Sequence, residues 1–189
     1  FGLGYFMLKA RSERERIALL SSHLRRYQIE KLMEQLNHGY LRALGEPDPE
    51  RRNPMWAALS EAEGQLAQQL SDLAADIGQL PAEQTRLCRV SLPMIERWLP
   101  QSTLDLRAVL RVHAEAVRAA TANHEQRSAK ARAHTLLAEL MLFQHTCHWF
   151  CKSRSVASFR LLARHRTAYE QVLEAIAEGR ERILLTLAT

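Results

Sequence analysis

Glycine and proline are scarce in this chain, with seven and six of 189 residues. Alanine, leucine, arginine, glutamate and glutamine are abundant, and this composition favours helices. Signals for β-structure are also missing, because the sequence shows neither a sustained alternation of apolar and polar residues nor an Asn-Gly or Asp-Gly turn. We therefore predict an all-α protein, an antiparallel helical bundle of four to six helices that forms one domain over residues 1–189.

Cysteine is rare as well, and the three present are Cys88, Cys147 and Cys151. An odd number of cysteines in a chain with 47% apolar residues does not fit a secreted disulfide scaffold. The familiar catalytic motifs are missing too: there is no Gly-rich phosphate loop, no Ser-His-Asp set and no HExxH. The sequence leaves the question of an enzyme open and leans against one.

Lysine accounts for only four of the 26 basic residues, and the net charge is +5. Arginine suits pairing with carboxylates and phosphates, although a preference for arginine codons explains the ratio equally well. The positive charge is compatible with an acidic partner or an anionic membrane face. It is lower than the charge density typical of nucleic-acid-binding proteins, so such a partner is considered but not favoured.

The most apolar stretch is Leu136–Cys151, in which eleven of sixteen residues are Leu, Met, Phe, Trp, Ala or Cys. Because apolar side chains point in nearly every direction around a helix of this sequence, it needs cover on all sides. It is too short and too interrupted by polar groups to span a bilayer unaided. We expect it to be the central helix of the bundle.

Long helices are expected on both sides of this stretch. The first is predicted over residues 5–44 and the second over 54–80, with Asn53 as its N-cap. The second has the clearest periodicity, since its apolar residues recur at spacings of three, four and seven, as in the seam of a bundle. These residues are Trp56, Leu59, Leu66, Leu70, Leu73, Ile77 and Leu80.

A short helix kinked at Pro93 is expected next, and Ser102 with Asp105 resembles a capping box for a helix that begins near Thr103. No glycine or proline occurs from Gln101 to Glu178. This helix either continues into the central stretch or turns near Asn123, and the turn is favoured. The last helix, capped by Ser153 or Ser155, is expected to bury five apolar residues: Phe159, Leu162, Tyr169, Leu173 and Ile176.

Four metal-capable residues cluster in the central stretch: His145, Cys147, His148 and Cys151. Zinc prefers nitrogen and sulfur ligands in tetrahedral geometry, and a neighbouring His113, His134 or Cys88 is a candidate for completing the site. The spacing matches neither a zinc motif nor the haem-attachment motif, and cysteine is often buried for packing alone. Zinc or haem is therefore a candidate cofactor beside an ordinary core.

Acidic residues are missing from Leu140 to Tyr169, where five basic residues occur. The N-terminus of the last helix adds its dipole and free N–H groups to this region. The sequence predicts a small-anion site there, and a solvated basic face is the alternative. The five residues are Lys152, Arg154, Arg160, Arg164 and Arg166.

Both ends of the sequence are apolar next to basic residues. Residues 1–8 precede the run KARSERER, and residues 183–189 follow Arg180 and Arg182. The first junction resembles the end of a transmembrane helix, and the positive-inside rule would place this side in the cytoplasm. An amphipathic helix start in a soluble cytoplasmic protein is the alternative.

These features together favour a non-enzymatic helical bundle with a sensory or regulatory interaction role in a membrane-anchored protein. Its expected partners are other proteins or a second copy, bound through helix faces, and a small anionic ligand. One alternative is a structural cytosolic domain of a multi-span transporter. Another is a soluble adaptor or nucleic-acid-binding module, whose affinity would fall steeply with salt.

Overall fold

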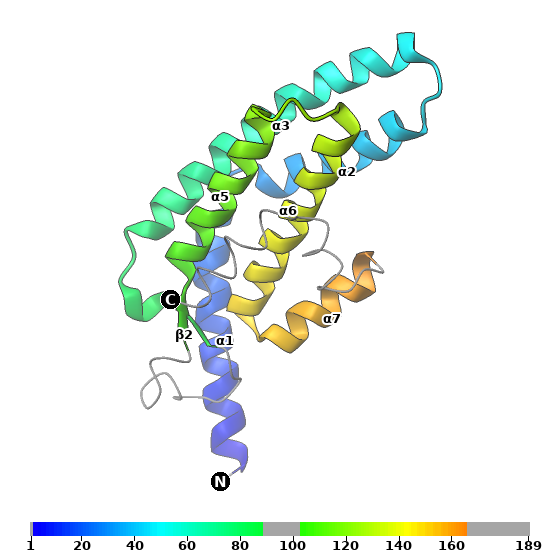
Figure 1. Cartoon of the computed structure of the whole chain (residues 1–189). Coiled ribbons are helices and arrows are strands. Elements are labelled where there is room, and N and C mark those ends of the chain that lie inside the picture. Colours follow the sequence, from blue (N-terminus) through cyan, green and yellow to red (C-terminus); the bar gives the residue numbers. More distant parts are fainter. Residues whose placement is uncertain (1, 89–102, 166–189) are drawn as a thin grey trace.

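The computed structural model describes residues 2–88 and 103–165, which form six α-helices, one 3₁₀ turn and two short strands. The prediction of an all-α helical bundle is confirmed (Figure 1). The elements in chain order are α1 (Gly2–Leu24), α2 (Ile29–Gly45), α3 (Pro49–Gly78), η1 (Ala82–Gln84), β1 (Arg86–Cys88), β2 (Thr103–Asp105), α5 (Leu106–Ala122), α6 (Ala129–Cys151) and α7 (Arg154–His165).

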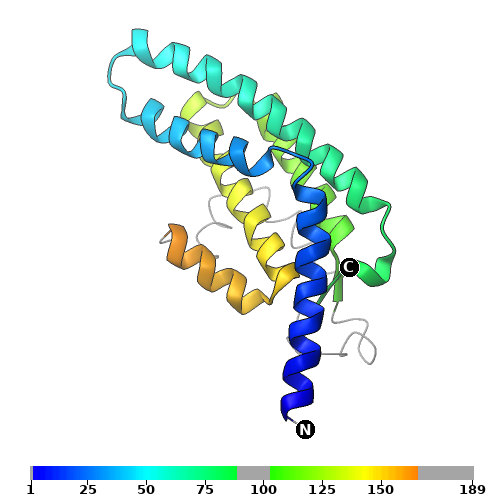
Figure 2. The ribbon, with the colours of Figure 1, turned by 180° about the vertical axis from the view of Figure 1, so that it is seen from behind.

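The helices are arranged around α6. Helices α2 and α3 form an antiparallel hairpin, α5 packs along α3, and α6 packs against α5, α2 and α1. Helix α7 folds back onto α6 at one side of the bundle (Figure 1). Seen from behind, α1 crosses the bundle and its N-terminal half extends beyond the other helices (Figure 2). This arrangement places α6 between α2 and α7.

The predicted seam and the predicted central helix are both present. In α3, Leu66, Leu73 and Ile77 have no exposed surface and Leu59 and Leu70 are also buried. Trp56 of α3 and Leu80, which follows the helix, pack partly buried against the core. In α6, eleven side chains are buried over its length. The core therefore runs between the α2–α3 hairpin, α5 and α6.

The expected single helix over residues 5–44 is wrong, because the chain breaks between α1 and α2. The break is held by α3: the Tyr27 hydroxyl donates to Asp76 at 2.7 Å, and the Gln28 backbone N–H donates to the Gln69 side chain at 2.7 Å. The apolar stripes before and after the break are out of phase, and one straight helix cannot turn both toward the core.

Two predicted helix starts are also displaced. Asp48, not Asn53, caps α3, accepting from the Glu50 N–H at 3.0 Å with Pro49 as the first helical residue. Both Asp-Pro and Asn-Pro are good starts, and the earlier one is used. Helix α5 begins at Leu106 instead of near Thr103, because Asp105 accepts from the Arg107 N–H at 2.9 Å and is the cap.

A small antiparallel sheet takes the place of the expected helix start. Thr103–Asp105 pairs with Arg86–Cys88, and the Leu106 N–H donates to the Thr85 carbonyl at 2.8 Å. Strands of three residues are too short to show the alternation by which strands are recognised in a sequence. Of the short helix expected after Pro81, the described part is η1 followed by β1, and Pro93 lies outside the described residues.

The turn near Asn123 and the cap at Ser153 are confirmed. Asn123 ends α5 in the left-handed conformation at φ 49°, and the Ser153 hydroxyl accepts from the Val156 N–H at 3.3 Å. The expected burial of Phe159 and Leu162 is wrong, since they are 71% and 49% exposed. Ala157 and Leu161 turn inward instead, and Tyr169, Leu173 and Ile176 lie outside the described residues.

Within the described ranges, no helix has a run long and apolar enough to cross a membrane. Residues 183–189, the second predicted membrane junction, lie outside those ranges. At the first junction, Phe6 and Met7 are each 67% exposed on the projecting part of α1.

Candidate functional site

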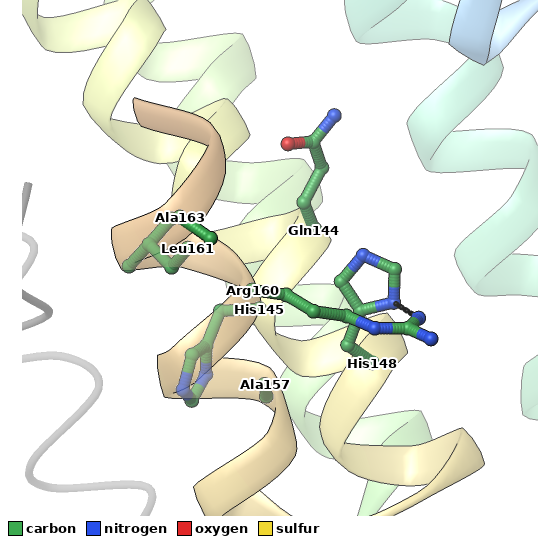
Figure 3. Close-up of a pocket in the computed structure, with 7 residues that line it drawn as sticks. All are labelled: Gln144, His145, His148, Ala157, Arg160, Leu161 and Ala163. Carbon is green, nitrogen blue, oxygen red and sulfur yellow. Dashed lines mark hydrogen bonds between the residues drawn. The ribbon is translucent and has the colours of Figure 1, made fainter. Parts of the chain in front are cut away.

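A cavity of about 430 Å³ lies between α6 and α7, and we call it the α6–α7 cavity (Figure 3). It exists because the chain turns sharply at Lys152 and Ser153, so that α7 packs back across α6. Among the described residues that line it, none is acidic. They are Gln144, His145, His148, Ala157, Arg160, Leu161 and Ala163.

Arg160 and His148 form the polar centre of this cavity. The Arg160 side chain extends from α7 across to α6, where its Nη1 lies 3.1 Å from His148 Nδ1 (Figure 3). Arginine is always protonated and has no acceptor, so Nδ1 of His148 accepts this hydrogen bond. Arg160 is exposed, and its remaining donors face an environment without a carboxylate among the lining residues.

His145 has a different role, although it lines the same cavity. Its imidazole is 2% exposed and its Nε2 lies 3.1 Å from the Ser158 hydroxyl on α7. Burial, with smaller contributions from the charges of Arg154 and His148, lowers the pKa of His145 to about 4. Figure 3 shows the His145 and His148 rings pointing to different sides of Arg160. The neutral His145 therefore fixes α7 to α6.

The structure does not bring the predicted metal ligands together: among the described residues, no three histidine, cysteine or acidic side chains are placed to hold a metal. His145 and His148 have the contacts given above, and Cys147 and Cys151 are free thiols whose pKa is raised by burial. The candidate fourth ligand His113 contacts Thr146 through its Nε2 at 2.8 Å. The Cys88 side chain lies outside the described set.

The predicted anion residues also separate into different environments. Lys152 pairs with Glu13 of α1 at 3.1 Å, and the Arg154 guanidinium lies over the Trp149 ring at 5.8 Å. Of the described members of this set, only Arg160 lines the α6–α7 cavity. The Arg164 side chain and Arg166 lie outside what the structure describes. The absence of acidic residues along the sequence did not reveal Glu13, which is distant in sequence and close in space.

A second cavity, which the sequence analysis did not predict, lies between α6 and α2. This α2–α6 cavity has a volume of about 540 Å³, and Gln144 and His148 belong to its walls as well as to those of the α6–α7 cavity. The signal for it was the spacing of Gln144 and His148, which lie four residues apart and so share one face of the helix. The remaining lining residues are Leu24, Glu30, Lys31, Met33, Glu34, Asn37, His38, Leu137, Leu140, Met141, Phe143 and Cys147.

A third cavity of about 580 Å³ lies between α3 and α5. Arg111 and Arg118 line it, but so do Asp105 and Glu115. Arg107 is already bound to Asp105 and to the Leu80 carbonyl. The positive charge of the arginines in this third cavity is therefore partly balanced by the acidic residues that line it.

Comparisons with protein-family models, with curated proteins and with solved structures find no match. The chemistry of the site must therefore be read from its own side chains. A cationic guanidinium beside a neutral imidazole acceptor, on the wall of a cavity, is suited to reversible binding of an anion.

Proposed function

We propose that this chain is a non-enzymatic helical-bundle domain that binds an anionic ligand in the α6–α7 cavity. The observation that carries the proposal is Arg160, whose guanidinium lies on the wall of that cavity with His148 as its contact there. A guanidinium matches the geometry of a carboxylate or phosphate, with which it forms two parallel hydrogen bonds.

The surroundings of Arg160 support the same ligand class. The Gln144 amide lines the cavity on the α6 side and is a further donor for an anion. An arriving carboxylate or phosphate would replace the neutral His148 Nδ1 as the acceptor for Arg160. Binding would therefore exchange a single hydrogen bond to a neutral acceptor for an ion pair that can form two parallel hydrogen bonds.

The proposed role is sensory or regulatory, in a membrane-anchored protein. Helix α7 rests on α6, which in turn contacts α1, α2 and α5, so a ligand between α6 and α7 acts on the helix shared by the bundle. Small shifts of packed helices are a common means of transmitting a binding event. Support for a membrane comes from the exposed Phe6, Met7 and Leu8, followed by basic residues on α1.

The test is calorimetric titration of the protein with acetate and with inorganic phosphate in chloride-free buffer. Arg160→Gln removes the charge and is expected to weaken binding about tenfold to hundredfold, the effect of losing hydrogen bonds to a charged group. Arg118→Gln is the matched control, because Arg118 is also an exposed arginine at a cavity. It should leave binding unchanged.

Two results would reject the proposal: wild-type protein that binds neither anion, or an Arg160→Gln variant that binds as the wild type does. Arg160→Lys separates charge from geometry. Partial retention of binding by the lysine variant is expected, since lysine keeps the charge and loses the two-pronged contact.

A further inference from the structure

We infer that the ligand is an anionic amphiphile, with its carboxylate or phosphate at Arg160 and its apolar chain along α6 in the α2–α6 cavity. This inference rests on the proposed function, because it assigns the charged end to the same site. It adds the chemical class of the remainder of the molecule and a second place of contact.

The first observation is that the two cavities meet on one stripe of α6. From Leu136 to Phe150 most side chains of this helix are buried, and the half-buried Leu137, Met141, Gln144 and His148 recur at spacings of four, three and four. Residues at this spacing lie on one face of a helix. Gln144 and His148 line both cavities, so a ligand at Arg160 has a direct path onto the Leu137 end.

The second observation is the apolar character of the α2–α6 cavity along its floor. Leu137, Met141 and Phe143 come from α6, and Met33 faces them from α2. Cys147 adds a protonated thiol, since burial raises its pKa. Methionine adapts its shape to irregular apolar groups, so the α6 side of this cavity offers a surface for an apolar chain, whereas its α2 wall is mostly polar.

The third observation is the mixed charge on the α2 wall of this cavity. Glu30, Lys31, Glu34 and His38 line it, and Glu30 lies near enough to Cys147 to help raise the pKa of that thiol. This wall therefore offers an anion no site without a nearby carboxylate, and the head of the ligand is assigned to Arg160 in the α6–α7 cavity. Eleven residues separate Leu137 from His148, which corresponds to about 16 Å along the helix, a length suited to an extended alkyl chain.

The experiment compares dodecanoate, below its micelle concentration, with acetate and with dodecyltrimethylammonium by calorimetry at one-to-one stoichiometry. Wild-type protein should bind dodecanoate at least about a hundredfold more tightly than acetate, because each buried methylene group contributes to affinity. The cationic amphiphile should bind much more weakly than dodecanoate. Arg160→Gln should weaken dodecanoate and acetate alike.

Met141→Trp fills the floor of the α2–α6 cavity and tests the chain separately from the head. It should weaken dodecanoate about tenfold, the effect of displacing one or two methylene groups, and leave acetate unchanged. Ala131→Trp is the matched control, because Ala131 is exposed on the same helix and lines neither cavity. Equal affinity for dodecanoate in the two tryptophan variants would overturn the inference.

The outcomes separate this inference from the proposed function. If acetate binds in an Arg160-dependent way and dodecanoate binds no more tightly, the amphiphile is rejected and the anion site stands. If neither binds, both are rejected. Vesicles of phosphatidylcholine with and without phosphatidylglycerol distinguish the source: Arg160-dependent binding to the anionic vesicles alone supports a lipid in a bilayer, and binding to dodecanoate alone supports a free amphiphile.

Discussion

Arg132 and Arg160 lie on opposite ends of the α6–α7 hairpin and meet opposite surroundings. Arg132, in the first turns of α6, forms an ion pair with Glu63 of α3 at 3.2 Å, and its Nη2 donates to Ser60 at 2.8 Å. Glu63 is 2% exposed and also accepts from the Tyr40 hydroxyl at 2.8 Å. Arg160 is exposed at a cavity and contacts a neutral imidazole.

The difference separates a structural arginine from one suited to ligands. A buried carboxylate needs a counter-charge and hydrogen bonds, and α2, α3 and α6 together supply them to Glu63. Burial nevertheless raises the pKa of Glu63, while Tyr40 and Arg132 lower it. At Arg160 no buried acid depends on the guanidinium among the described residues, so its charge is available at low structural cost.

The largest expected effect comes from removing the structural arginine. Arg132→Gln leaves the buried Glu63 carboxylate without its counter-charge and is expected to lower the free energy of unfolding by about 3–5 kcal/mol. Chemical denaturation followed by circular dichroism measures it. Protonated Glu63 is neutral and does not need a counter-charge. The difference in the free energy of unfolding between variant and wild type should therefore be smaller at pH 5 than at pH 7. If Arg132→Gln lowers the free energy of unfolding by less than about 1 kcal/mol, Arg132 is not a structural arginine and does not differ from Arg160 in this respect.

The fold was largely predictable because helices of this length repeat their pattern many times. The predicted seam contains seven apolar residues at helical spacing, and the apolar stretch in α6 needs other helices around it on every side. The break before Ile29 was not predictable, because it is held by Tyr27 and Gln28 through contacts with α3, some 40 residues away. The start of α3 was also not predictable from local sequence, because Asp48 and Asn53 are each followed by proline and are equally good N-caps.

The candidate site was predictable only in part. The sequence pointed to Arg160 through the lack of nearby acidic residues, but the same pattern included Lys152, which pairs with Glu13 of α1. Sequence distance hides such pairs, and it also hides the α2–α6 cavity, whose walls come from helices about 100 residues apart. The metal-capable cluster stays a prediction: the described side chains form no group of three metal ligands, and spacing on one helix does not by itself direct four side chains to one point.

An intermediate effect is expected from the buried histidines, which belong to the packed part of the molecule. Burial lowers the pKa of His113 and of His145 to about 4, below the 6.5 of an unfolded histidine. The neutral form is therefore favoured in the folded state. Stability is fully present above pH 6.5 and decreases as the pH falls toward 4, by about 3 kcal/mol for each histidine.

The measurement is the free energy of unfolding between pH 7 and pH 4 for the wild type, His113→Gln and, as a second variant, His145→Asn. Each substitution removes one titrating group and should flatten the pH dependence, even if it lowers stability at pH 7. Parallel curves for all three proteins would mean that the pKa values of these histidines are not lowered in the folded state.

The smallest effect is expected at Arg160 itself. Arg160→Gln should change the free energy of unfolding by less than about 0.5 kcal/mol, as is usual for exposed side chains without a buried partner. The same variant should lose anion binding, so thermal denaturation with and without phosphate separates the two properties in one experiment. Wild-type protein should be stabilised by the anion and the variant should not, since a ligand stabilises only a state that binds it. A loss above about 1.5 kcal/mol without ligand would instead place Arg160 with Arg132, as a residue that holds α7 on α6.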